Sequence, residues 1–170
     1  MVREYKFRDI NVYQLVLGPL ETNNYIIVNN RREAVLIDCT SSKEIIEFIE
    51  SNDLKLCYIL LTHCHVDHVC GVDLVSKRFK CKVMLNLKEF YHLNEARMVY
   101  RIYGFNEEPY IEDFEEINED SVIKIEGLNL RVLFTPGHTL GSLSFFENEK
   151  KILFSGDVLF YESIGRTDLP

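Results

Sequence analysis

The segment LLTHCHVDHVCG, residues 60–71, constrains the fold of this chain more strongly than any other stretch. It overlaps the end of the apolar run LCYILLT, residues 56–62, which is typical of a strand buried on both faces. Three imidazoles and one carboxylate then crowd into six positions: His63, His65, Asp67 and His68. A loop after a strand can turn alternate side chains toward one point, so this spacing favours metal ligation over a surface loop whose histidines titrate freely. Such ligands suit zinc, iron or manganese.

The segments before this cluster match an antiparallel meander. Residues 12–38 contain three runs rich in β-branched and aromatic residues, and residues 29–30 occupy the position of a hairpin turn. Ser41 and Glu44 then have the spacing of a capping box, which predicts a helix that ends near Ser51.

The segments after the cluster alternate between helix and strand. Helical patterns cover residues 72–79 and 87–103, and the acidic stretch 105–120 is expected to be a surface excursion. Further strands are expected at residues 82–85, 122–125, 128–134, 142–147 and 151–154. Because no repeat or linker divides the pattern, we expect one α+β domain over residues 1–170, with two sheets and helices outside them.

Composition limits what this domain can bind. Of the 170 residues 46% are hydrophobic, which is enough for a substantial core. The formal net charge of −8 offers no basic surface, so we expect no nucleic-acid partner. No apolar run approaches the roughly 20 residues of a membrane span, and the charged N-terminus lacks a signal-peptide pattern. We therefore expect a cytoplasmic protein that does not bind membranes and whose five irregularly spaced cysteines are free thiols.

Two later motifs place further ligand types after strands. FTPGHTLGS, residues 134–142, carries His138 in a turn sharpened by proline and glycine. ILFSGDVLF, residues 152–160, carries Asp157 next to Gly156, which permits a close approach of the backbone. Ligand-type side chains thus recur at strand ends, where the active sites of layered sheet proteins gather.

The motifs THCHVDH, TPGHTLGS and FSGDVLF resemble, in this order, signature motifs of the metallo-β-lactamase superfamily. SIGRTDLP, residues 163–170, is similar to its glyoxalase II-like branch, which includes hydroxyacylglutathione hydrolases and persulfide dioxygenases. The resemblance implies a four-layer αββα sandwich with metals at one edge between the sheets. It also implies ligand roles: His63, His65 and His138 for a first metal, Asp67 and His68 for a second, and Asp157 as a bridge.

The resemblance also suggests that the chain is C-terminally incomplete, as a fragment or a shortened variant. The family site uses a final histidine after a further strand, and this sequence has none. His92, the remaining histidine, is expected to be a packed or surface residue. We therefore expect a weak second metal site and a fold that lacks its last elements. The exposed sheet edge should favour self-association.

The activity implied is hydrolysis of a small thioester or ester, including glutathione-derived substrates. One or two zinc ions, or iron or manganese, would generate hydroxide from bound water. Asp67 would orient or deprotonate that water. Arg166 could bind a glutathione carboxylate, or it could instead pair with Asp168.

Other functions compete with hydrolysis of thioesters. A single iron held by His63, His138 and Asp157 would resemble the persulfide dioxygenases of the superfamily. A third hypothesis is that the chain has no catalytic activity and only binds a metal ion or a partner. β-Lactam hydrolysis is less favoured, because GRTDLP resembles the other branch.

Overall fold

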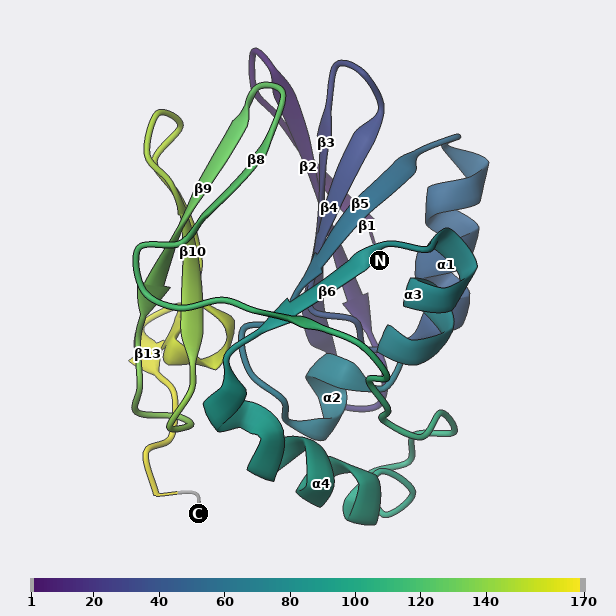
Figure 1. Cartoon of the computed structure of the whole chain (residues 1–170), viewed down its shortest axis with the longest axis vertical. Coiled ribbons are helices and arrows are strands. Elements are labelled where there is room, and N and C mark those ends of the chain that lie inside the picture. The colour runs from purple at the N-terminus through teal and green to yellow at the C-terminus, as the bar shows by residue number, and fades with distance from the viewer. Residues whose placement is uncertain (1, 169–170) are drawn as a thin grey trace.

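Two β-sheets packed face to face form the centre of the molecule, and helices cover the outer face of the larger sheet (Figure 1). The structure is a computed structural model, and it describes residues 2–168. The order of elements confirms the α+β sandwich that the sequence predicts.

The larger sheet has seven strands in the order of the chain. They are β1 (Val2–Lys6), β2 (Ile10–Leu17), β3 (Thr22–Asn29), β4 (Glu33–Ile37), β5 (Lys55–Leu60), β6 (Lys82–Leu85) and β7 (Glu115–Glu116). Strands β2 to β4 form the predicted antiparallel meander, β1 adds an unpredicted antiparallel strand at its edge, and β4 to β7 run parallel to one another. The predicted surface excursion at 105–120 is therefore only partly exposed, because it supplies β7 and buries Phe105, Ile111 and Ile117.

The helices occupy the crossovers between the parallel strands. They are α1 (Ser42–Ser51), α2 (Val66–Val69), α3 (Val72–Phe79), the 3₁₀ turn η1 (Leu87–Glu89) and α4 (Phe90–Val99). Helices α1 and α3 lie side by side on the outer face, and α4 passes below the sheet beside α2 (Figure 1). The capping-box prediction is wrong in its contacts, because the Ser41 hydroxyl donates to the Glu44 carboxylate rather than accepting a backbone N–H.

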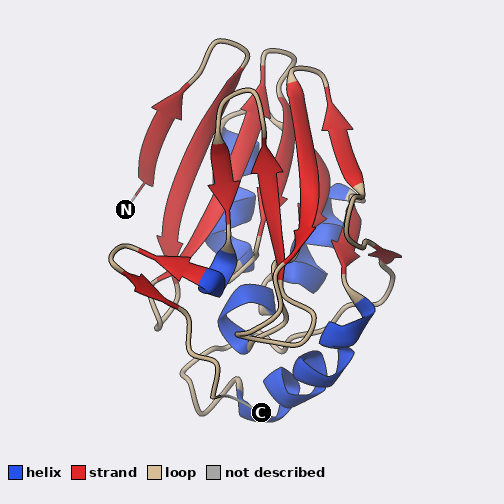
Figure 2. Cartoon of the chain, turned by 90° about the vertical axis from the view of Figure 1, so that its left-hand side faces the viewer, coloured by secondary structure: helices blue, strands red, loops and turns tan. Residues whose placement is uncertain are grey.

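The smaller sheet is antiparallel and follows in the second half of the chain (Figure 2). Its strands are β8 (Val122–Ile125), β9 (Leu128–Phe134), β10 (Leu143–Glu147) and β11 (Ile152–Phe154). The 3₁₀ turn η2 (Gly156–Val158) and the hairpin of β12 (Leu159–Phe160) and β13 (Ser163–Ile164) come next. Through residue 168 no α-helix follows β8, so the fourth layer of the expected αββα sandwich is not among these elements.

Two hydrophobic clusters form the core, one on each face of the larger sheet. Ile26 and Leu36 pack into the cluster under the helices, whereas Ile27 and Val35 pack into the cluster between the sheets. Successive strand residues point to opposite faces, so apolar runs buried on both sides are the expected pattern for these strands. Each such side chain stabilises the fold by about 1.5–3 kcal/mol.

Apolar side chains also remain on the surface of the C-terminal hairpin. Tyr161 is 91% exposed and Ile164 is 69% exposed. Self-association through an exposed sheet edge stays a prediction. None of the helices in the described part of the chain has the length and apolar character needed to cross a bilayer.

Candidate metal centre

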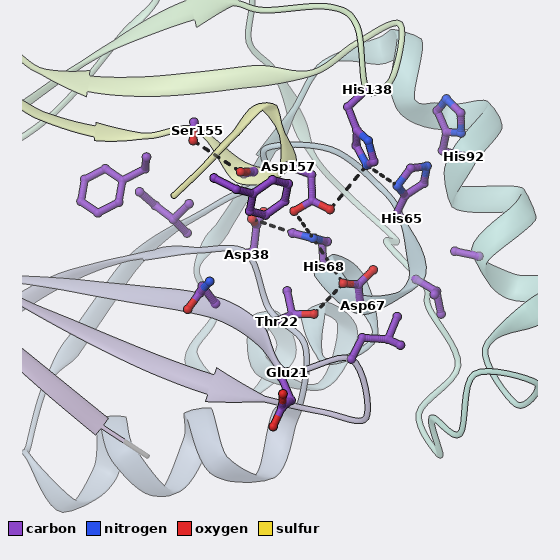
Figure 3. A pocket seen from close by; sticks show the side chains of 18 of the residues that line it. Glu21, Thr22, Asp38, His65, Asp67, His68, His92, His138, Ser155 and Asp157 are labelled. Atoms are coloured by element: carbon purple, nitrogen blue, oxygen red, sulfur yellow. Dashed lines mark hydrogen bonds and ion pairs between the residues drawn. The ribbon is translucent and has the colours of Figure 1, made fainter. Parts of the chain in front are cut away.

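Loops at the ends of β4, β5, β9 and β11 meet at one edge of the sandwich and line a pocket of about 720 Å³. Figure 3 shows side chains from all four loops turned toward one another. Parallel strands β4 and β5 end at the same edge of their sheet, and the two sheets face each other, so loops far apart in sequence converge there. His65, Asp67, His68, His138 and Asp157 thus line the pocket, and His63 lies within ligand distance of four of them.

The first group contains three imidazoles. One ligand nitrogen from each of His63, His65 and His138 lies within 4.8 Å of the other two. The closest pair is His138 Nε2 and His65 Nδ1, at 2.9 Å. This is the set that the family resemblance of the motifs assigns to the first metal.

The second group contains His63, His68 and Asp157, whose ligand atoms also lie within 4.8 Å of one another. Asp157 Oδ1 is 3.4 Å from His68 Nε2, and its Oδ2 is 3.5 Å from His138 Nε2. Asp157 therefore stands between the two groups, as a bridging ligand would. Asp67 lies at the margin, with Oδ2 3.4 Å from His68 Nε2.

The hydrogen-bond network determines which nitrogen of His63 faces the pocket. The Thr62 hydroxyl has one proton, which it donates to Asp38 Oδ2 at 2.8 Å. His63 Nδ1 lies 3.0 Å from that hydroxyl and must therefore donate to it. The lone pair of His63 is left on Nε2, the tautomer that a metal requires.

Two further histidines are oriented in the same way. His68 Nδ1 lies 2.8 Å from Asp38 Oδ2, and His138 Nδ1 lies 3.1 Å from the carbonyl oxygen of Arg166. Both acceptors hold the proton on Nδ1, so Nε2 of each ring faces the pocket. Asp38 is 2% exposed and also accepts the backbone N–H of Thr62 at 2.8 Å. In the sequence, Asp38 is distinguished only as the last residue of a predicted strand.

Buried, unpartnered nitrogen atoms test whether a cation fits. Nε2 of His63 and Nε2 of His68 are buried and form no hydrogen bond, and the polar atoms near His68 Nε2 are carboxylate oxygens of Asp67 and Asp157 at 3.4 Å. A buried polar atom without a partner costs about 1–3 kcal/mol, and metal ligation would remove that cost. The donor set therefore fits a divalent transition ion held by imidazole and carboxylate.

The pKa values of these histidines differ according to their neighbours. Burial and the adjacent imidazoles hold the pKa of His63 well below its ordinary value and lower the pKa of His65 to about 4. Burial opposes charging of His68, but Asp67, Asp38 and Asp157 outweigh it and hold the pKa of His68 well above its usual range. Burial would raise the pKa of Asp157, but His68 and the other imidazoles outweigh it and lower that pKa. Neutral His63 and His65 are ready to ligate, as metal binding requires.

The remaining predicted residues lie near the centre without joining either group. Asp67 accepts the Thr22 hydroxyl at 2.5 Å. Arg166 lines the pocket, and its guanidinium pairs with Asp168 through two contacts of 2.9 and 3.0 Å, the second of the two roles expected for it. His92 on α4 is 3% exposed and packs edge-on against His65, so of the two expectations for it, packed or surface, the structure shows the packed one.

Comparisons with known proteins relate this site to a family. A model of the metallo-beta-lactamase superfamily matches residues 17–170. Hydroxyacylglutathione hydrolase GloC of Haemophilus influenzae is 33% identical over 164 residues, which cover 95% of this chain and 77% of that protein.

Two solved structures share both sequence and fold with the chain. TTHA1623, solved in a di-iron-bound form, superposes with a TM-score of 0.81 at 31% identity and covers 92% of this chain and 77% of its own. The BLEG-1 B3 metallo-beta-lactamase gives a TM-score of 0.79 at 36% identity, with 94% and 78% covered. These similarities are consistent with a metal-binding role for the pocket.

Proposed function

Because the chain belongs to the metallo-β-lactamase superfamily, we propose that it is a metal-dependent hydrolase of small thioesters. The observation that carries the proposal is the pair of buried, unpartnered nitrogen atoms, His63 Nε2 and His68 Nε2, in two residues whose ligand atoms lie within 4.8 Å of each other. Each belongs to a group of three ligand atoms close enough to hold an ion. Zinc is the metal we assign first, with iron or manganese as substitutes.

The proposed ligands divide between two ions. The first ion would be held by His63, His65 and His138. The second would be held by Asp67, His68 and Asp157, with Asp157 shared between the two. Bound there, divalent cations supply Lewis acidity and lower the pKa of water. The second site has fewer imidazoles, so we expect it to bind its ion more weakly.

Asp67 is the residue that we assign to proton transfer. The Thr22 hydroxyl holds Asp67 Oδ2 at 2.5 Å, so the carboxylate has a fixed orientation. Its other oxygen, Oδ1, would orient the attacking water and accept its proton. The thiolate that leaves a thioester needs little protonation, so this substrate class places the smallest demand on a proton donor.

The substrate assignment is supported by the relative named hydroxyacylglutathione hydrolase. A glutathione carboxylate could be bound by Arg166, but only if the guanidinium exchanges its present partner Asp168. A charge-assisted, bidentate pair of the same geometry would replace the internal one.

The persulfide dioxygenase alternative requires His63, His138 and Asp157 on one iron. Asp157 instead groups with His63 and His68, while His138 groups with His63 and His65. Asp157 Oδ2 is also 3.5 Å from His138 Nε2, so the choice between the two-site hydrolase and the single-iron site is left to the assays below. The di-iron form of TTHA1623 is the reason to test iron as well as zinc.

The test is an assay of thiol release from a hydroxyacylglutathione by protein loaded with zinc or with iron. We expect turnover, and we expect Asp67→Asn to lower kcat about 10²- to 10⁴-fold because it removes the proton acceptor. Asp73→Asn is the matched control, since Asp73 pairs with Lys77 on α3 and should leave kcat unchanged.

Two further substrates distinguish the alternatives. Hydrolysis of a β-lactam is measured because one similar structure is a B3 metallo-beta-lactamase. Oxygen uptake with glutathione persulfide, measured on the iron form, tests the persulfide dioxygenase alternative. Failure of metal-loaded protein to hydrolyse any thioester or ester would reject the proposal.

A further inference from the structure

A buried carboxylate, Glu89, connects the two loops that carry the first group of histidines. Glu89 is 1% exposed and lies on η1. Its Oε2 accepts the backbone N–H of Cys64 at 2.8 Å. Its Oε1 accepts the backbone N–H of Gly141 at 2.8 Å and the hydroxyl of Thr139 at 2.7 Å.

These partners flank the proposed ligands in sequence. Cys64 lies between His63 and His65, and Thr139 directly follows His138. One carboxylate thus hydrogen-bonds to both the loop after β5 and the loop between β9 and β10. These loops are far apart in sequence, because 73 positions separate His65 from His138.

The loop between β9 and β10 is shaped around Glu89. A Cβ atom on Gly141 would lie 2.6 Å from Glu89 Oε1 and 3.0 Å from its Cγ, so only glycine allows this approach. Because the Thr139 hydroxyl donates to Glu89, its contact with the Ser142 hydroxyl at 2.6 Å must be donated by Ser142. The loop therefore arranges a chain of donors toward a carboxylate that would be costly to bury without them.

We propose that Glu89 is a positioning residue for the first metal site. Its three hydrogen bonds set the separation of the two loops, and with it the 2.9 Å spacing of His65 Nδ1 and His138 Nε2. Partners that orient metal ligands determine the affinity of a site as well as its geometry. The inference rests on the metal site of the proposed function but not on its substrate.

The experiment compares cobalt binding by the full chain and by Glu89→Gln. One amide end cannot accept a hydrogen bond, so at least one backbone N–H loses its acceptor and the two loops separate. We expect the dissociation constant for the first Co²⁺ to rise about 10- to 100-fold, with a changed visible absorption spectrum of the bound ion.

Glu147→Gln is the matched control for loss of a buried carboxylate. Glu147 is also 1% exposed and accepts the backbone N–H of Lys150 at 2.5 Å, but it lies on β10 outside the pocket. We expect this variant to lose thermal stability while keeping the cobalt affinity and spectrum of the unmodified chain.

Thr139→Val provides a milder test if Glu89→Gln does not fold. It removes one of the three hydrogen bonds, and we expect the cobalt dissociation constant to rise about three- to tenfold. Unchanged cobalt affinity and spectrum in a folded Glu89→Gln or Thr139→Val variant would overturn this inference alone. An unmodified chain that binds no cobalt or zinc would overturn both it and the proposed function.

Discussion

At the residue scale, Asp38 determines which nitrogen of His68 faces the pocket. Its two oxygens accept three protons, from the backbone and hydroxyl of Thr62 and from His68 Nδ1. A neutral amide cannot serve all three donors. Asp38 therefore orients the ring and also contributes negative charge beside it.

Asp38→Asn should weaken the second metal site. We expect its metal affinity to fall about 10- to 100-fold, because the ring loses the acceptor that orients it. The raised pKa of His68 should fall as well, since the Asp38 charge helps to hold it up. Calorimetric zinc titration and an NMR pH titration of the metal-free protein measure the two effects. A second-site affinity equal to that of the unmodified chain would contradict this role.

The stability of the metal-free protein should fall as pH drops from about 6.5 to about 4. In the folded state the pKa of His65 is about 4 and that of His63 is also lowered, so in this window the unfolded chain binds more protons. Each such histidine contributes a slope of at most about 1.4 kcal/mol per pH unit. His68 has a raised pKa in the folded state, so it opposes this loss just below pH 6.5 and adds no slope once the unfolded imidazole is fully protonated, below about pH 5.5.

Urea unfolding at several pH values checks this dependence, with His65→Asn as the comparison. The variant should lose part of the slope, because it has no imidazole to protonate at that position. A free energy of unfolding that stays constant or rises on acidification from pH 6.5 to pH 5 would show that these rings are not buried in the neutral form.

The sequence predicts the ligand-type side chains but not the groups that orient them. His63, His65 and His138 lie in motifs whose spacing is unusual enough to stand out. Asp38 and Glu89 are single carboxylates among 27 acidic residues, and no spacing distinguishes them. Their roles depend on donors distant in sequence, which only the folded chain brings together.

At the scale of elements, the turn from β11 into η2 depends on Gly156. Its φ is +50°, and a Cβ atom there would lie 2.4 Å from Thr62 Oγ1 and 2.7 Å from Thr62 Cβ. Thr62 is the residue that links Asp38 to His63. The close approach expected from the sequence at Gly156 is therefore confirmed. The residue that it approaches, Thr62, belongs to the hydrogen-bond network that orients the histidines.

Gly156→Ala should destabilise the chain by about 1–3 kcal/mol through overpacking, in addition to about 1–2 kcal/mol for the left-handed backbone. Gly104→Ala separates the two contributions, since Gly104 has φ +83° but its nearest neighbour, Pro19 Cγ, is 3.4 Å away. Chemical denaturation of both variants measures the difference. Equal losses of stability would show that the contact with Thr62 is unimportant.

The predicted helices and strands match the structure best where their residues are buried. The segments 72–79 and 82–85 match α3 and β6 at both ends, because α3 buries an apolar face and β6 is buried on both faces of the sheet. The helix predicted for 87–103 begins as a 3₁₀ turn and ends at Val99. Strand β1 was not predicted, because all five of its residues are exposed and it forms only by pairing with β2.

At the scale of the whole molecule, the sandwich brings loops from both sheets to one edge. Apolar runs such as those of β4 and β5 predict strands buried on both faces, and hence two core layers. Local pattern does not say which strand ends share an edge. That part of the prediction came from the resemblance of the three motifs, and the pocket between the sheets agrees with it.

The convergence of three histidines on one ion is the claim on which the proposed chemistry depends. A crystal structure of the zinc-loaded chain, with anomalous scattering measured at the zinc edge, tests it most directly. We expect an ion about 2.0–2.1 Å from nitrogen atoms of His63, His65 and His138. An anomalous peak elsewhere, or none at the pocket in crystals grown with zinc, would contradict the account.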